Sequence, residues 1–111
     1  MSLYAEYLKE RESVDTIEFD NGFATYQFLG NGNIYLKDIY VTKRFRDGDL
    51  CDRLEMAVIL IGKSIGCHSI IGSFCLNANN WQKSKRTLRK RNYKFLKLDK
   101  PTKMVYLRKG I

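Results

Sequence analysis

The chain has 111 residues, 44% of them hydrophobic, with a single proline and a formal net charge of +8. These values exclude a disordered chain and predict one globular domain over residues 1–111. No apolar run approaches the roughly 20 residues that span a bilayer, and no secretory signal is visible, so we expect a cytoplasmic protein without a membrane segment. Three cysteines without a close pair and one histidine argue against disulfides and a metal site.

The amino-terminal segment predicts a short amphipathic helix. Ser2 is a good helix-capping residue, and the helical periodicity extends to about residue 11. The apolar residues of this segment recur at positions that share one helical face. We expect that face to pack on the core through Leu3, Tyr4, Tyr7 and Leu8.

Three strands are predicted next, at residues 13–19, 23–29 and 34–41. The segments between them, 20–22 and 30–33, are rich in Asn and Gly, which tolerate the positive φ of tight turns. The three strands are therefore expected to form an antiparallel meander.

The hydrophobic period then changes to that of a helix. One apolar stripe at helical spacing comprises Leu50, Leu54, Ala57, Val58, Ile61 and Ile65. Asp47 or Asp49 can cap the start of this helix, and Gly66 stands where a glycine commonly ends one.

The remaining segments complete the predicted fold. The nearly continuous apolar run 67–76 is typical of a central strand covered on both faces. A basic helix is predicted at 80–91, followed by strands at 93–98 and 104–107. The order α-β-β-β-α-β-α-β-β predicts an α+β domain with one mixed sheet packed by helices.

Two segments resemble a known family. Residues 38–51, DIYVTKRFRDGDLC, resemble the strand and pyrophosphate loop of the GCN5-related N-acetyltransferases (GNATs). Residues 80–93, NWQKSKRTLRKRNY, resemble the last helix of that family, with Asn92 in place of the usual glycine before the aromatic Tyr93. The resemblance covers nearly the whole chain, although the family's first strand and first helix are missing or reduced. It implies the GNAT fold, acetyl-CoA as cofactor, and acetyl transfer to an amine.

The first segment implies how the cofactor would be held. Strand backbone would bind the acetyl carbonyl and pantetheine arm, provided that this strand separates from the next central strand. Free amides at the following helix N-terminus would bind the diphosphate. The implied cofactor-binding residues are Ile39, Tyr40, Val41, Arg46, Asp47, Gly48, Asp49, Leu50 and Cys51. Asp49 and Cys51 replace family glycines, and Asp47, Asp49 and Asp52 add negative charge near the phosphates. The sequence therefore leaves open whether this loop binds CoA tightly or has lost that binding.

The resemblance also implies two catalytic residues. Asp38 matches a carboxylate that serves as general base. It is predicted to share a face with Ile34 and Leu36 and to be buried there; the alternative is a solvated carboxylate paired with a lysine such as Lys37. Ser84 takes the small-residue position of the last helix. Many family members use a tyrosine to protonate the departing thiolate, but Leu88 stands at that position, so Ser84 or a water would have to serve.

The charge is unevenly distributed along the chain. Residues 83–109 hold twelve of the 20 Lys and Arg residues and one acid, Asp99, so this segment carries +11. Such a field attracts polyanions. A second hypothesis is therefore a GNAT-fold protein without catalysis, of the compact kind that phages encode, which binds nucleic acid or an acidic protein surface through this region. The acceptor amine and the oligomeric state are not specified by the sequence.

Overall fold

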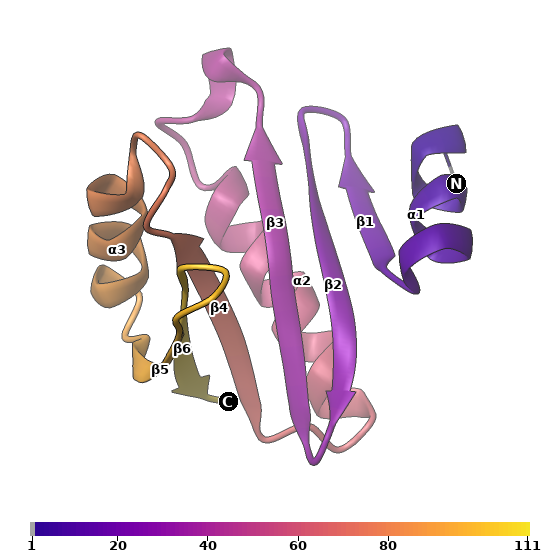
Figure 1. Ribbon diagram of the computed structural model, residues 1–111. Helices are drawn as coiled ribbons and strands as arrows, with labels where there is room; N and C mark the ends of the chain where they lie inside the picture. Colours follow the sequence, from indigo (N-terminus) through magenta and orange to yellow (C-terminus); the bar gives the residue numbers. More distant parts are fainter. Residues whose placement is uncertain (1) are drawn as a thin grey trace.

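The structure, a computed structural model, describes residues 2–111 as one six-stranded mixed sheet with three helices (Figure 1). The elements in chain order are α1 (Leu3–Glu12), β1 (Asp15–Phe19), β2 (Gly22–Gly30), β3 (Asn33–Val41), the 3₁₀ turn η1 (Lys43–Phe45), α2 (Leu50–Ser64), β4 (Ser69–Cys75), α3 (Trp81–Lys90), β5 (Lys94–Asp99) and β6 (Met104–Gly110). The predicted order of helices and strands and the α+β class are confirmed.

The strands follow the order β1-β2-β3-β4-β6-β5 across the sheet. The first three form the predicted antiparallel meander. β3 and β4 are parallel and are connected through α2, whereas β6 pairs antiparallel with both β4 and β5. β4 is thus a central strand, mostly buried, as its apolar run predicted. Within residues 2–111 no helix has the length and apolar character needed to cross a bilayer.

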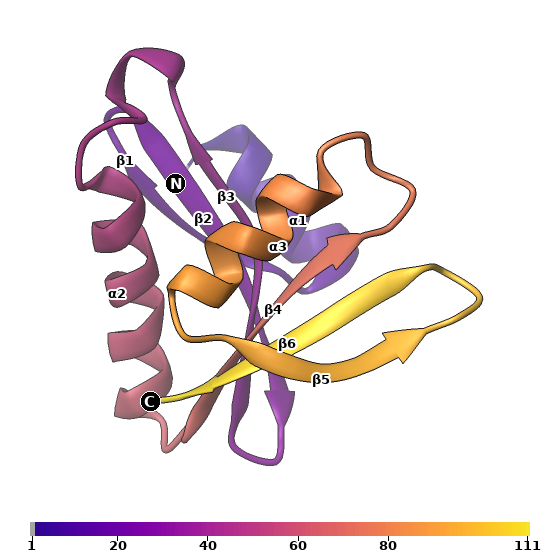
Figure 2. The same cartoon turned by 90° about the vertical axis from the view of Figure 1, so that its left-hand side faces the viewer.

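Helices cover the two faces of the sheet unequally (Figure 2). α2 lies over one face, where a Cβ placed on Gly22 would be 3.3 Å from the side chains of Leu50 and Leu54. The adjacent Phe23 points to the opposite face, and its ring centroid lies 6.1 Å from that of Tyr4 in α1. α3 shares the face of α2, because a Cβ on Gly72 of β4 would come within 2.8 Å of the Leu88 side chain.

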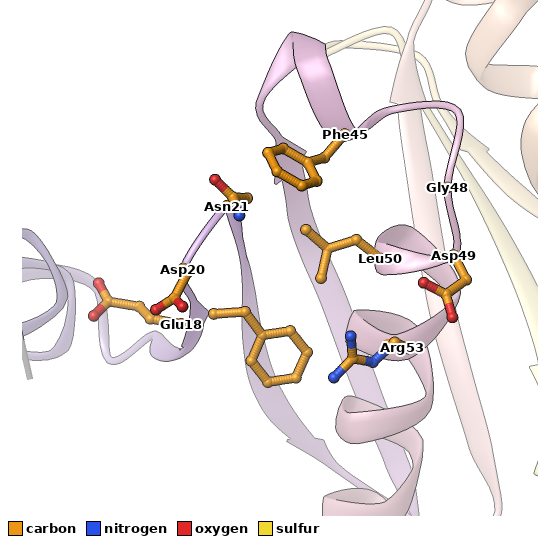
Figure 3. Close-up of a pocket in the computed structure, with 9 residues that line it drawn as sticks. Glu18, Asp20, Asn21, Phe45, Gly48, Asp49, Leu50 and Arg53 are labelled. Carbon is orange, nitrogen blue, oxygen red and sulfur yellow. The ribbon is translucent and has the colours of Figure 1, made fainter.

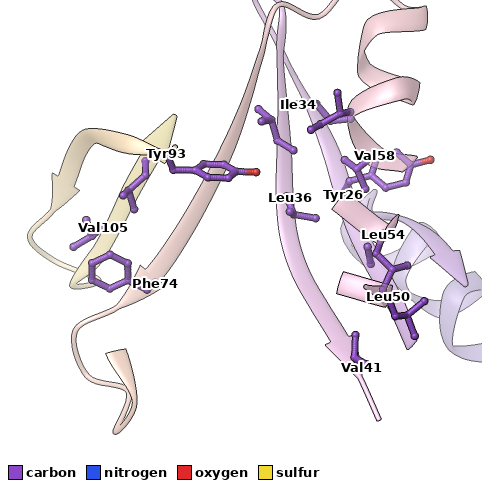
Figure 4. Close-up of a cluster of buried hydrophobic side chains, with 14 residues drawn as sticks. Tyr26, Ile34, Leu36, Val41, Leu50, Leu54, Val58, Phe74, Tyr93 and Val105 are labelled. Carbon is purple, nitrogen blue, oxygen red and sulfur yellow. The ribbon is translucent and has the colours of Figure 1, made fainter. Parts of the chain in front are cut away.

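The core lies between α2 and the sheet (Figure 4). Leu54 and Val58 of α2 pack there with Ile34 and Ile70, and all four side chains are fully buried. Two residues of the predicted α2 stripe, Ala57 and Ile61, are half-buried, and Ile65 is exposed. The buried stripe instead includes the next positions around the helix, namely Glu55, Ile59 and Gly62. It is therefore rotated slightly from the predicted one.

The predicted apolar face of α1 is correct in part, since Leu8 is buried and the Tyr4 ring contacts Phe23, and the helix and its cap are confirmed. The Ser2 hydroxyl oxygen accepts a hydrogen bond from the Ala5 amide at 3.1 Å. The two residues of α1 that the fold buries are Ala5 and Leu8. The larger apolar side chains lie on the exposed side of the helix, with exposed fractions of 83% for Leu3, 53% for Tyr4 and 54% for Tyr7. The buried residues of α1 are thus spaced three apart.

A β-bulge in β3 reverses the side-chain alternation that the sequence predicts. Leu36 pairs with Tyr26 and Asp38 pairs with Thr25, so Lys37 is an extra residue in the ladder. Asp38 therefore lies on the α1 face of the sheet, beside Thr25, and does not share the core face of Leu36. Ile39 and Val41, which were predicted to lie away from that face, turn to the α2 side instead.

We expect Leu54→Ala to lower the free energy of unfolding by about 2–5 kcal/mol, because it removes a fully buried side chain and leaves a cavity in the core. Leu60→Ala is the matched control in the same helix, since Leu60 is 58% exposed, and it should change stability by less than about 0.5 kcal/mol. Urea unfolding of the two variants measures both values. Equal losses would contradict this packing of α2.

Candidate active site

The parallel strands β3 and β4 separate partway along their length. They pair at three positions, Asn33 with Ser69, Ile34 with Ile70 and Tyr35 with Ile71, and the ladder ends there. From residue 36 onward the two strands diverge, and a cavity of about 450 Å³ lies along the unpaired part of β3. The separation on which the implied cofactor site depends is therefore present.

This cleft collects most of the sequence-predicted site residues. β3 contributes Asp38, Ile39, Tyr40 and Val41. α3 contributes Ser84, α2 contributes Cys51, and the loop after β3 contributes Arg46. The predicted tyrosine position, Leu88, also lines the cleft. Segments that are distant in sequence thus meet at one cavity.

The other predicted loop residues lie elsewhere. Gly48, Asp49 and Leu50 line a second cavity of about 590 Å³, between the start of α2 and the β1–β2 turn (Figure 3). The Leu50 side chain belongs to the core. Asp47 is exposed and lines neither cavity. Any contribution of these four residues to the cleft would have to come from their backbone.

Asp38 and Ser84 approach the cleft from opposite faces of the sheet. Asp38 lies on the α1 face, where the Thr25 hydroxyl donates a long hydrogen bond of 3.4 Å to its carboxylate. The expected burial of Asp38 is wrong, because this side chain is exposed. The alternative pairing with a lysine is not seen either, since Lys37 pairs with Glu12 at 3.2 Å. Ser84 is half-buried on α3, on the other face.

The N-terminus of α2 carries free backbone amides. Asp49 occupies the capping position, but its side chain forms no capping hydrogen bond. The first N–H groups of a helix have no acceptor within the helix, and its dipole makes this end positive. Of the three nearby carboxylates, Asp52 is held by Arg91 at 2.7 Å. The start of α2 therefore remains able to receive an anion.

Arg46 connects the end of β3 to this helix start. Its Nε donates to the Val41 carbonyl oxygen at 2.9 Å, and its guanidinium carbon lies 5.7 Å from the centroid of the Tyr40 ring. Within residues 2–111 the other guanidinium N–H groups form no hydrogen bond to the protein. The residue thus keeps a positive charge at the cleft, with donors to spare.

A buried polar cluster, centred on Glu55, joins the two walls of the cleft. Glu55 of α2 is 7% exposed, and its carboxylate accepts a hydrogen bond from the Tyr93 hydroxyl at 2.8 Å. Arg91 and Lys109 lie 3.4 and 3.3 Å from its other oxygen. Burial of the ring and then the charge of Glu55 raise the pKa of Tyr93 above its ordinary value of 10.0. The sequence analysis missed Glu55, whose one available signal is an acid directly beside the apolar stripe of α2.

Cys51 lines the cleft as a neutral thiol. Burial raises the pKa of its thiol above the ordinary value of 9.0, and this outweighs the opposing charge of Arg91. A thiol in this state is a poor nucleophile at neutral pH. Its contribution to the cleft is therefore one of shape.

Comparison with known proteins identifies the fold. No family model matches the chain, and no curated protein matches it by sequence. Among solved structures, a GNAT family acetyltransferase from Elizabethkingia anophelis with acetyl-CoA bound is similar over 96% of this chain and 82% of its own, at 13% identity and a TM-score of 0.75. An acetyltransferase from Bacillus subtilis in complex with CoA is similar over 96% of this chain and 83% of its own, at 12% identity and a TM-score of 0.71. Nourseothricin acetyltransferase is similar over 81% of this chain and 57% of its own, at 16% identity and a TM-score of 0.68.

These similarities, together with the separated parallel strands, define the fold of the chain. The chain has the fold of the GNAT superfamily, as the sequence resemblance implied. It spans 57% of the nourseothricin enzyme and about four fifths of the other two.

We expect Tyr93→Phe to reduce the decrease in the free energy of unfolding that occurs as pH rises into the alkaline range. Because the folded-state pKa of Tyr93 is raised, its contribution is fully present below pH 10 and decreases as pH rises above the unfolded-state value. Up to about 1.4 kcal/mol per pH unit is then lost in the wild type. Urea unfolding from about pH 8 to about pH 11 should show a shallower decline in the free energy of unfolding for Tyr93→Phe than for the wild type. Tyr7→Phe, at an exposed site, is the control and should follow the wild type.

Proposed function

We propose that this protein is an N-acyltransferase that uses acetyl-CoA to acylate an amine. The observation that carries the proposal is the cleft between β3 and β4, which Cys51 in the first turn of the uncapped helix α2 also lines. Proteins of the same fold were crystallised with CoA or acetyl-CoA, which supports this choice of cofactor.

The residues present fit the parts of the cofactor. The unpaired edge of β3, residues 36–41, offers backbone donors and acceptors to the amides of a pantetheine arm. The free amides at the start of α2 and the charge of Arg46 suit a diphosphate. Asp47 and Asp49 reduce the positive potential there, whereas Asp52 is already neutralised by Arg91. The backbone of Ile39 to Val41 would hold the acetyl carbonyl and the pantetheine arm.

Acetyl-CoA supplies a thioester, and transfer forms a C–N bond to the amine while the C–S bond breaks. Asp38 would accept the proton that the amine must lose, and its exposure on the α1 face lets an acceptor approach from that side. Ser84, on the other face, would donate a proton to the thiolate, since Leu88 provides no hydroxyl. The two proton transfers would thus occur on opposite sides of the sheet.

We expect acetyl-CoA to bind with micromolar affinity in a calorimetric titration, and Arg46→Ala to weaken that binding about tenfold through loss of a charge-assisted contact to phosphate. Arg44→Ala is the matched control, since this neighbouring arginine lies over Phe45 and does not line the cleft. Absence of binding heat for the wild-type protein would favour a GNAT-fold protein without catalysis.

We expect Asp38→Asn to lower kcat by a factor of about 10² or more while the Kd for acetyl-CoA stays within about twofold, because the change removes a base and leaves the cofactor contacts intact. Release of free CoA thiol in the presence of a panel of amino acids, polyamines and peptides with free N-termini measures the rate. Asp20→Asn, in the β1–β2 turn, removes the same charge away from the cleft and should leave the rate unchanged. An unaltered rate in Asp38→Asn would remove this residue from the mechanism.

A further inference from the structure

We propose that the exposed side of α3, together with the adjoining apolar residues of β5, binds single-stranded nucleic acid. This surface is defined by Lys83, Arg86, Arg89 and Lys90 of α3 and by Phe95 and Leu98 of β5. The inference does not depend on acyl transfer and would hold for an enzyme or for a protein without catalysis.

The basic residues of this surface have no partner within the described chain. α3 packs on the sheet through Trp81, Ser84 and Leu88, and the Trp81 ring stacks on that of Phe74 at a centroid distance of 6.1 Å. All four basic side chains are exposed, and Lys83 also lines the cleft between β3 and β4, whereas the lining of that cleft does not include the other three. Among residues 2–111 the ion pairs of this region involve Arg91 and Lys109, which hold Asp52 and Glu55, and leave these four free.

The charge pattern of α3 is also unfavourable for the helix itself. Its first turn contains no acid, and Lys83 places a positive charge at the positive end of the helix dipole. Exposed Lys and Arg residues at three- and four-residue spacing repel one another as well. Arg89 and Lys90 in the last turn interact favourably with the dipole, so the cost is confined to the first turn and to the mutual repulsion, which an external polyanion would relieve.

An apolar platform adjoins this basic side. Phe95 pairs with Leu107 and Leu98 pairs with Val105, so both lie on the same face of the sheet as α3. α3 covers β4 and leaves the edge strand β5 open, so Phe95 is 67% exposed and Leu98 is 41% exposed. Figure 2 shows that β5 begins after the turn at the C-terminal end of α3 and then runs away from the helix. The exposed Phe95 ring therefore follows the basic last turn of α3 by a few residues of chain.

This combination favours single-stranded nucleic acid over other polyanions. Lys and Arg neutralise phosphates, and an accessible aromatic ring stacks on an unpaired base. A duplex hides its base faces, so the exposed ring would find no base to stack on there. An acidic protein would match the charges, and competition by polyglutamate distinguishes it from a single strand. The surface thus meets both requirements of a single strand.

Fluorescence anisotropy with short labelled oligothymidine and oligouridine tests the proposal. We expect binding that weakens with salt, and the double variant Arg86→Gln/Arg89→Gln should bind at least tenfold more weakly at low salt, with a log–log salt slope smaller by about 1.4. Phe95→Leu keeps an apolar side chain but loses stacking, and we expect it to weaken binding about tenfold. An unchanged urea unfolding midpoint in both variants would confirm folding.

The control variant Arg11→Gln/Lys63→Gln removes the same charge from exposed positions on α1 and α2. It should bind oligothymidine within about twofold of the wild type. An equal loss in this control would show that net charge alone causes binding and would overturn the proposed surface. Tighter binding of a duplex, or competition by polyglutamate as effective as that by unlabelled oligothymidine, would also overturn it, the latter in favour of an acidic protein partner.

Discussion

In the described chain, β3 and β4 pair at three positions. The cleft exists because the two strands separate beyond those pairs. Two parallel strands that diverge lose their backbone hydrogen bonds, so the walls must be held together by other contacts. α2 provides them, because it packs on β2 and β3 while its Glu55 reaches Tyr93, Arg91 and Lys109 on the far side. A buried carboxylate with three partners thus replaces part of the missing ladder, and removal of one partner would leave charge unpaired.

The arrangement of elements was predictable because its signals are local. The Asn and Gly turns between the first strands set the meander, and the change of period after residue 49 marked α2. The left-handed Asn92, with a φ of 72°, ends α3 as the family comparison implied. Each of these features depends on neighbours within one or two turns of chain, so the sequence alone contains the information. The GNAT resemblance then supplied the topology that periodicity leaves open.

The details of the site were not predictable in the same way, because they depend on distant pairing. The bulge at Lys37 exists only in register with Thr25 and Tyr26, and alternation read from the sequence assigns Asp38 to the wrong face. Glu55 is buried because Tyr93, 38 residues later, brings a hydroxyl to it. The predicted apolar face of α1 was incorrect in part for a related reason. Ala5 and Leu8 are buried against the rest of the fold, whereas the bulkier Tyr7 lies on the exposed side of the helix.

The bulge also organises the proposed chemistry. Without the extra residue, Asp38 would point to the α2 side and compete for space with the core, and a carboxylate buried there would carry a large desolvation cost. With it, the carboxylate and the Thr25 hydroxyl lie on the α1 face, to which Tyr40 and the Arg46 guanidinium beside its ring also belong, while Ser84 lies on the other side. In the proposed reaction the amine would approach Asp38 from the α1 side and meet acetyl-CoA where β3 and β4 separate.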